Sequence, residues 1–271
     1  MNHKIFEPQE NLKEWIQCYW NLESDFENTP LKNTIIPDGT MKLIFHYGDT
    51  YKHHSNDKES IILPRCFLIG QLTKPYVVEP LGVTGSFVVR FQPNGFFPFA
   101  NISIKEIQNT AVPLNKLFGK DGDKIGEQIL NANSSSERIT FIETFLLERL
   151  VEKNTIDNIV KSTVETIIEA NGQFSVNELS EQNNINRRQL TRKFSSTIGL
   201  SPKQLSKTIR IQNTLKTLLT KDIKSLTDLA YENEYFDQAH FIKDFKEFTG
   251  LTPKEFYGND LKMSLIFDSK D

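Results

Sequence analysis

The sequence predicts an α+β protein, in which a small N-terminal β-barrel or sandwich with flanking helices precedes an all-helical domain. Three observations support this prediction. Short apolar runs separated by Gly and Pro fill residues 34–92, helical periodicity dominates after residue 112, and one pattern is written twice between Ser175 and Tyr257. The 271 residues suffice for two domains. We expect these domains at 1–153 and 154–260, with a tail at 261–271.

The repeated pattern describes two short helices joined by a turn. The paired positions are Ser175 and Ser225, Leu179 and Leu229, and Asn183 and Asn233 at an offset of 50, then Phe194 and Phe245, Gly199 and Gly250, and Pro202 and Pro253 at an offset of 51. Each serine is a good N-cap with an acid three residues on, and each glycine can end a helix. Each copy therefore predicts a helix-turn-helix, whose second helix can enter a major groove.

The two copies, their GLSP and GLTP endings and the string FDQAHFIKDFKEFTGLTP resemble the DNA-binding domain of the AraC/XylS family of transcription regulators. The resemblance covers roughly Ile159 to Tyr257. It implies two motifs joined by a long helix, here Pro202 to Thr220, and sequence-specific binding of double-stranded DNA. The turn glycine usual in the family is replaced by Asn184 and by Glu234. Asn tolerates a left-handed conformation, whereas Glu234 needs another turn geometry or strain.

Charge is distributed unevenly over the two motifs. From Ile185 to Lys224, ten basic residues face one acid, a balance of +9 in a chain of net charge −3. From Ser225 to Asp260, three lysines face eight acids, a balance of −5. The first stretch has the charge expected of a phosphate-binding surface, although a solvated helix face explains most charge runs. We therefore expect the first motif to dominate DNA binding.

Helical periodicity selects the residues that would face DNA once Leu190, Phe194, Phe241 and Phe245 are buried. The predicted DNA-binding residues are Arg187, Arg188, Thr191, Arg192, Lys193, Gln238, His240 and Lys243. Arginine forks match guanine and glutamine matches adenine, so Arg188, Arg192 and Gln238 are the candidates for base contacts. Thr191, Lys193 and Lys243 suit phosphate or flanking contacts. His240 lies close to the buried face and is equally compatible with packing.

The N-terminal half shows strand periodicity after a first segment that fits a helix or a helix leading into a strand. The predicted strands lie around the Pro-Asp-Gly turn at Pro37, at Cys66 to Gly70, Pro75 to Glu79 and Gly85 to Phe91. The strings PDG, LIGQLTKPYVV and VVRFQPNGFFPFANI resemble the cupin-like sensory domain that precedes many AraC-type readers. That resemblance implies a sensor but does not indicate the signal; a small-molecule effector is the candidate partner.

A ligand pocket in this half would be lined by large apolar side chains and one cation. The candidate ligand-binding residues are Trp15, Trp20, Phe45, Phe67, Phe87 and Arg90. A buried arginine could hold a carboxylate or phosphate of the ligand. The alternative for these six residues is ordinary core packing, with Arg90 at the surface.

The helices between the two halves carry a wide apolar stripe at Ile139, Ile142, Phe145, Leu146 and Leu150. Such a stripe can cover the barrel or pair with its copy in a second subunit. The family resemblance favours a homodimer. Arg210 matches a frequent arginine of the family, which implies a buried pair between the motifs; a surface position is the alternative.

The sequence contains no pattern that indicates catalysis, a cofactor or a metal site. Cys18 and Cys66 lack CxxC spacing and are expected to be reduced, and His53 and His54 fit a solvated loop better than a metal site. No run of 18 apolar residues and no leader is present, so we expect a soluble, cytoplasmic protein with no membrane partner. Two alternatives stay open: control by a protein partner, and an enzyme fused to a DNA reader.

Overall fold

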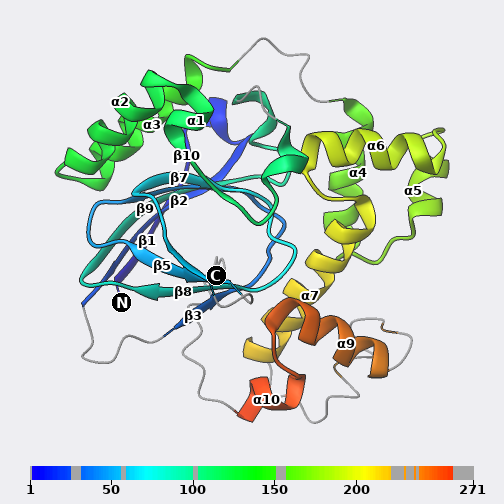
Figure 1. Ribbon diagram of the computed structural model, residues 1–271. Helices are drawn as coiled ribbons and strands as arrows, with labels where there is room; N and C mark the ends of the chain where they lie inside the picture. Colours follow the sequence, from blue (N-terminus) through cyan, green and yellow to red (C-terminus); the bar gives the residue numbers. More distant parts are fainter. Residues whose placement is uncertain are drawn as a thin grey trace.

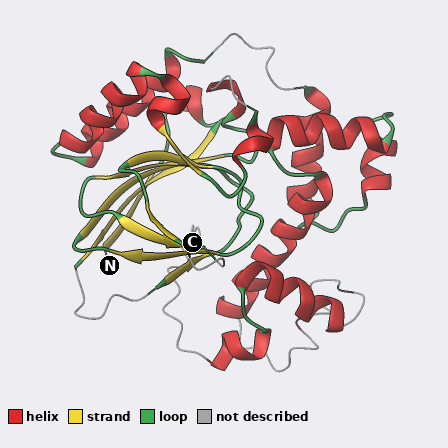
Figure 2. Cartoon of the chain, in the orientation of Figure 1, coloured by secondary structure: helices red, strands yellow, loops and turns green. Residues whose placement is uncertain are grey.

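The structure is a computed structural model that describes residues 2–25, 32–55, 59–99, 103–150, 157–220 and 238–258, together with positions 229 and 235. Two β-sheets form the N-terminal half, and helices form the C-terminal half (Figure 1). Figure 2 shows the strands gathered on one side of the molecule, with helices above them and along their other side. This arrangement confirms the predicted α+β class and order.

The six-stranded sheet is antiparallel in every described pairing. Its strands, in spatial order, are β1 Asn2–Phe6, β2 Ile16–Ser24, β9 Thr84–Phe91, β4 Lys42–His46, β7 Cys66–Ile69 and β10 Ala111–Pro113. All residues of β9 are buried, because both of its faces are covered. The central strands of this sheet therefore present one face to the flanking helices and the other to the interior of a sandwich.

The second sheet has four strands and faces the first. Its spatial order is β3 Asn33–Ile35, β8 Tyr76–Pro80, β5 Tyr51–His54 and β6 Ser60–Ile62. Phe67 and Ile69 of β7 share a buried apolar cluster with Tyr76 and Val78 of β8, which joins the two sheets. The predicted barrel or sandwich is thus a sandwich of two separate sheets.

Three helices cover the outer face of the six-stranded sheet, as Figure 1 shows. They are α1 Leu114–Phe118, α2 Lys120–Asn131 and α3 Ser135–Leu147. Ile142, Phe145 and Leu146 of α3 are buried in the same cluster as sheet residues, and Ile139 and Leu150 are half-buried and pack against it. The three buried residues are therefore intramolecular core, which matches the part of the stripe expected to cover the barrel. The homodimer stays a prediction.

Two local predictions in the N-terminal half have different outcomes. The first segment contains the short 3-10 helix η1, Glu10–Leu12, and then enters β2 at Ile16, so the alternative of a helix leading into a strand holds and that of a continuous helix does not. His53 and His54 belong to β5 and are half-buried, with the His53 ring stacked on Tyr76 at 3.7 Å and the His54 imidazole 2.6 Å from a Glu79 carboxylate oxygen. Strand pairing of β5 with β8 brings those partners together, so the two histidines are not in a solvated loop.

Further 3-10 helices, η2 Phe97–Phe99 and η3 Ile104–Ile107, connect the sheet to the helices. The helical region then consists of α4 Asn158–Glu169, α5 Val176–Gln182, α6 Arg187–Ile198, α7 Pro202–Thr220, α9 Gln238–Thr249 and α10 Pro253–Gly258. The 19-residue α7 is about 28 Å long at 1.5 Å per residue. Figure 1 shows α6 near one end of α7 and α9 near the other.

Each motif has its own apolar core. Leu190 and Phe194 of α6 pack with Leu179 of α5 and residues of α4, whereas Phe241 and Phe245 of α9 pack with α7. Asn184, at the turn between α5 and α6, has φ 48°, which is the left-handed conformation expected there. Glu234, most of the segment expected to form the first helix of the second motif, and the tail lie outside the described residues.

The N-terminus of α5 supplies a first testable prediction. Ser175 Oγ accepts a hydrogen bond from the Glu178 backbone N–H at 3.1 Å, and Glu178 Oε2 accepts one from the Ser175 N–H at 2.8 Å. Ser175→Ala removes one half of this capping box and should lower the free energy of unfolding by about 1 kcal/mol. Urea denaturation followed by circular dichroism measures this. Asn177→Ala, an exposed change in the same first turn whose side chain is not part of the capping box, is the control and should be close to neutral.

No helix in the described part of the chain is both long and apolar enough to cross a membrane.

Candidate nucleic-acid interface and ligand cavity

The N-terminal half of α6 presents a cluster of free cations. Arg187, Arg188 and Arg192 are exposed, and none of them forms an ion pair with a described residue. The Asn186 side chain caps the helix by accepting from the Gln189 N–H at 2.9 Å, so the helix begins immediately before these arginines. Helix periodicity buries Leu190 and Phe194 and leaves the arginine forks in solvent. This face can contact the phosphates and base edges of a duplex.

Other predicted DNA-binding residues are engaged differently. Thr191 and Lys193 are half-buried, and the Lys193 ammonium forms an ion pair with Asp157, whose carboxylate also caps α4 through the Ile159 N–H at 2.9 Å. Lys193 is thus tied to the scaffold of the first motif. In the second motif, Gln238, His240 and Lys243 of α9 are exposed, so His240 is not a packed core residue.

Some cations of the +9 stretch are paired with acidic residues, so the exposed positive charge is smaller than the sequence suggests. Lys207 lies 2.8 Å from the Asp244 carboxylate and 2.7 Å from that of Glu247, which joins α7 to α9. The Arg210 guanidinium carbon lies 4.9 Å from the centre of the Tyr235 ring. Arg210 thus contacts the second motif through an aromatic face, which is neither of the two positions expected for it.

A cavity of about 500 Å³ lies between the two sheets and is bordered on one side by α7. Trp20, Phe67 and Arg90 line it, together with Ile209, Gln212, Asn213 and Lys216 of α7. Its volume lies within the roughly 300–1,000 Å³ typical of small-molecule sites. The cavity is therefore large enough for a small organic ligand that would contact both halves of the chain.

The other predicted ligand-binding residues lie elsewhere. Phe45 and Phe87 are fully buried in the core between the six-stranded sheet and its helices, and Trp15 packs against that core. Phe45 lies between Ile44 and His46, and Phe87 lies between Ser86 and Val88, all four of which line the cavity. Successive side chains of a strand point to opposite faces of the sheet, so both phenylalanine rings point away from the cavity. Of the six residues proposed for the lining, the structure brings only Trp20, Phe67 and Arg90 to it.

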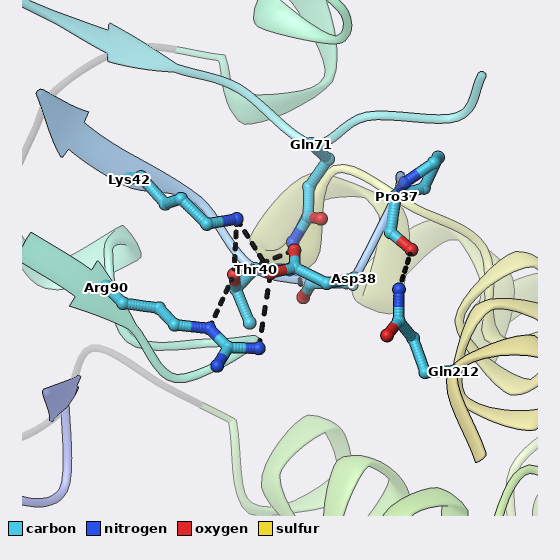
Figure 3. Close-up of polar contacts among 8 residues, drawn as sticks. Pro37, Asp38, Thr40, Lys42, Gln71, Arg90 and Gln212 are labelled. Atoms are coloured by element: carbon cyan, nitrogen blue, oxygen red, sulfur yellow. Dashed lines mark hydrogen bonds and ion pairs between the residues drawn. The ribbon is translucent and has the colours of Figure 1, made fainter. Parts of the chain in front are cut away.

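An ion cluster at one end of the cavity was not predicted. Asp38 Oδ2 lies 2.7 Å from Lys42 Nζ and 3.2 Å from Arg90 Nη2, and the Thr40 hydroxyl donates to Asp38 Oδ1 at 2.9 Å (Figure 3). Burial alone would raise the pKa of Asp38, but the nearby Lys42 and Arg90 charges outweigh it and hold that pKa at about 2. Asp38 is therefore ionised at neutral pH. The available signal was a lysine, Lys42, within a strand of otherwise mostly apolar residues.

The segment that carries Asp38 also holds α7. Gln212 Nε2 donates to the Pro37 carbonyl at 2.7 Å, and Gln71 Nε2 donates to the Gly39 carbonyl at 3.0 Å (Figure 3). Ile36 is buried in the apolar cluster of α7 and α9. Gly39 has φ 75°, and a Cβ there would lie 2.7 Å from Leu205 Cδ1. The polar end of the cavity is thus physically continuous with the helix that joins the two motifs.

Comparison with known proteins supports the assignment of the helical region. A family model described as a helix-turn-helix domain matches residues 179–258. The chain carries a helix-turn-helix domain of the AraC type. A second model, described as a domain of unknown function (DUF6597), matches residues 4–113 and covers most of the two sheets. The AraC-type domain therefore follows an N-terminal domain whose family description names no ligand.

The curated relatives match only part of this chain. Uncharacterized helix-turn-helix transcriptional regulators of Staphylococcus aureus are 34% identical over 86 residues, which cover 32% of this chain and 11% of the relatives. A corresponding regulator of Haemophilus influenzae is 24% identical over 152 residues, 53% of this chain and 51% of that protein. The chain thus matches only a minor part or about half of the length of these relatives.

Solved structures show weaker similarity. ToxT from Vibrio cholerae has a TM-score of 0.45 and 15% identity, covering 88% of this chain and 97% of its own. The C-terminal domain of AraT, a response regulator from Geobacillus stearothermophilus, has a TM-score of 0.36 and 21% identity, covering 43% of this chain and 93% of its own.

Proposed function

We propose that this protein is a sequence-specific DNA-binding transcription regulator whose N-terminal domain senses a small molecule. The observation that carries the first part is the exposed Arg187, Arg188 and Arg192 cluster at the start of the second helix of a helix-turn-helix. In this motif that helix enters the major groove with its N-terminal residues toward the bases. The arginine cluster supplies phosphate attraction and guanine-matching forks in the same place.

The second part rests on the cavity. Its walls come from both sheets and from α7, so an occupant would contact the sensing half and the DNA-reading half at once. A ligand that fits one arrangement of these walls better than another would shift the protein toward that arrangement. Control by a protein partner is the alternative. A concave, partly polar cavity between two sheets favours a small molecule over a protein surface.

A catalytic role has less support. Burial raises the pKa of the Cys66 thiol to about 11, so this cysteine stays protonated at neutral pH and is a poor nucleophile. Cys18 is buried and forms no disulfide bond with a described residue. No group of three or more His, Cys, Asp or Glu side chains in the described part of the chain is arranged to hold a metal ion. These features fit a regulator better than an enzyme fused to a DNA reader.

The direct test is to sequence genomic DNA fragments retained by the purified protein, with and without an extract of small molecules from the cells. A shared sequence element among the retained fragments, whose recovery changes with the extract, is the expected result. Retention of fragments without a shared element would contradict sequence-specific reading. If the fragments share an element but their recovery is the same with and without extract, small-molecule sensing alone is contradicted.

The second motif should contribute less to binding than the first. Lys243→Ala removes an exposed cation from α9, in a region whose net charge is negative, and should weaken specific binding less than Arg192→Ala does. Fluorescence anisotropy with a labelled specific duplex measures both variants. Complete loss of binding in Lys243→Ala, with protection of two consecutive major grooves in the wild type, would show that the second motif is the stronger reader.

A further inference from the structure

The cavity-facing residues of the two central strands are arranged in levels. β4 and β9 pair so that Lys42 lies opposite Arg90, Ile44 opposite Val88 and His46 opposite Ser86, and all six line the cavity. Neighbouring levels are two residues apart, or about 6.5 Å, so the outer levels are about 13 Å apart. One wall of the cavity is thus charged at one end, apolar in the middle and polar but uncharged at the other.

The middle level extends sideways into aromatic side chains. Trp20 of β2 lies opposite Val88, and Phe67 of β7 lies opposite Ile44. Both aromatic side chains line the cavity on either side of the aliphatic pair. A flat, apolar ligand body would pack here against two rings and two branched side chains. The middle of the cavity therefore favours a ring-containing body.

The charged level holds more positive than negative charge. Lys42 and Arg90 are 8% and 9% exposed, and Asp38 is the only half-buried or buried carboxylate among the described lining residues. Arg90 Nη1 is buried and has no hydrogen-bond partner among the described residues. Asp38 pairs with Arg90 only through Nη2, whereas a ligand carboxylate or phosphate in its place could accept from Nη1 as well and satisfy this buried donor. The charged end thus favours an anionic group.

The far level offers neutral hydrogen-bonding groups. His46 Nδ1 lies 2.8 Å from Ser86 Oγ, and His46 Nε2 is buried without a partner among the described residues. Burial is the main cause that lowers the pKa of His46 to about 4, with Arg65 adding to it, so the ring is neutral at pH 7. A hydroxyl or carbonyl group of a ligand could pair with this histidine.

We propose that the cavity binds an elongated organic anion with a ring-containing apolar body and a hydrogen-bonding group at its far end, and that the anionic group displaces Asp38 from Lys42 and Arg90. This inference rests on the proposed sensing function and specifies its ligand. Asp38 acts as a resident carboxylate in the position that the ligand carboxylate takes. The far group sets specificity, because an analogue without it leaves His46 unpaired.

Displacement of Asp38 would be transmitted to the DNA-reading half. Asp38 lies between Pro37, whose carbonyl accepts from Gln212 of α7, and Gly39, which packs on Leu205 of the same helix. Ile36 extends this segment into the core of the second motif. A ligand that moves Asp38 therefore loosens contacts that hold α7, the helix between the two motifs.

Three probes of similar length test the two ends of the proposed ligand one at a time. The first, 4-(4-hydroxyphenyl)butanoate, has both end groups. The second, 4-phenylbutanoate, lacks the far hydroxyl, and the third, 4-(4-hydroxyphenyl)butan-1-ol, lacks the anionic group. Calorimetric titration of the full chain should give the first probe an affinity about tenfold above each of the others. Equal affinity of the alcohol and the hydroxy acid would refute the claim that the charged end of the cavity binds an anionic group. Absence of binding by all three probes at millimolar concentration would overturn the whole proposal.

Two variants test the charged level and the far level of the cavity separately, and a third serves as a control. Asp38→Asn removes the resident carboxylate and should tighten both acids by about tenfold without tightening the alcohol. Asp121→Asn removes an exposed carboxylate, the partner of Arg149, outside the cavity and should change none of the affinities. Ser86→Ala should abolish the preference for the hydroxylated acid. Weaker binding of the acids by a folded Asp38→Asn protein would refute displacement, and the three wild-type affinities still test the ligand class if this variant does not fold.

Amide hydrogen exchange tests the transmission to α7. Binding of the hydroxy acid should speed amide exchange within Pro202–Thr220. Unchanged exchange with the acid bound would refute the proposed transmission to α7. None of these measurements contains DNA, so their failure is distinct from failure of DNA reading. If the protein binds the hydroxy acid but retains no DNA fragments with a shared sequence element, this inference holds and the proposed regulatory function is wrong.

Discussion

Arg192→Ala is expected to weaken binding to the specific DNA site by about 1 to 3 kcal/mol, which is roughly 5- to 150-fold. The Arg192 side chain is exposed on α6, on the face opposite the buried Leu190 and Phe194, and no described residue competes for its guanidinium. A guanidinium in this position can pair with both acceptors of a guanine. Removing it should also relax the base preference at one position of the site. Arg188→Ala should behave in the same way at a neighbouring position.

The control removes one exposed positive charge near α6. Lys203→Ala, in the first turn of α7, deletes a charge that is also exposed and unpaired among the described residues. It should weaken specific and random duplexes equally, since it can act only through phosphates. Anisotropy titrations on both duplexes at one salt concentration compare the variants. If Arg192→Ala lost the same factor on both duplexes, Arg192 would be a phosphate contact without a role in specificity.

The helical half could be predicted closely because its signals are local. The N-cap serine, the apolar spacing and the terminal glycine lie within one helix, so the bounds of α7 match the expected Pro202 to Thr220 and α6 ends at Gly199. Asn184 adopts its left-handed conformation for the same local reason. A pattern within about four residues determines whether a helix starts, continues or stops.

The cavity was harder to predict because its polar end is assembled from distant segments. Asp38 was recognised only as part of a turn, and its partner Arg90 lies on a strand that pairs with β4 through long-range sheet contacts. Both faces of β9 are buried, so alternation could not tell which face meets the helices and which meets the cavity. Phe87 and Arg90 therefore both fitted the lining, although they point to opposite faces of the sheet. Only the pairing of the strands separates them.

The stripe on α3 illustrates the same difficulty and leads to the largest expected loss of stability. Leu146→Glu should lower the free energy of unfolding by about 4 kcal/mol or more, enough to unfold the N-terminal half. Leu146 is 0% exposed and packs in the core between α3 and the six-stranded sheet, so the new carboxylate would be buried among apolar side chains, away from water. Had this residue been part of an exposed dimer surface, the same change would have produced a folded monomer.

Thr140→Glu places the same charge on the exposed face of α3 and should change stability by no more than about 0.5 kcal/mol. Circular dichroism during heating and analytical sedimentation, applied to both variants, distinguish the outcomes. Loss of the cooperative transition in Leu146→Glu alone is expected, because only that charge is buried. A stable Leu146→Glu protein with a reduced sedimentation coefficient would instead assign the stripe to a subunit interface, and the core described for α3 would be wrong.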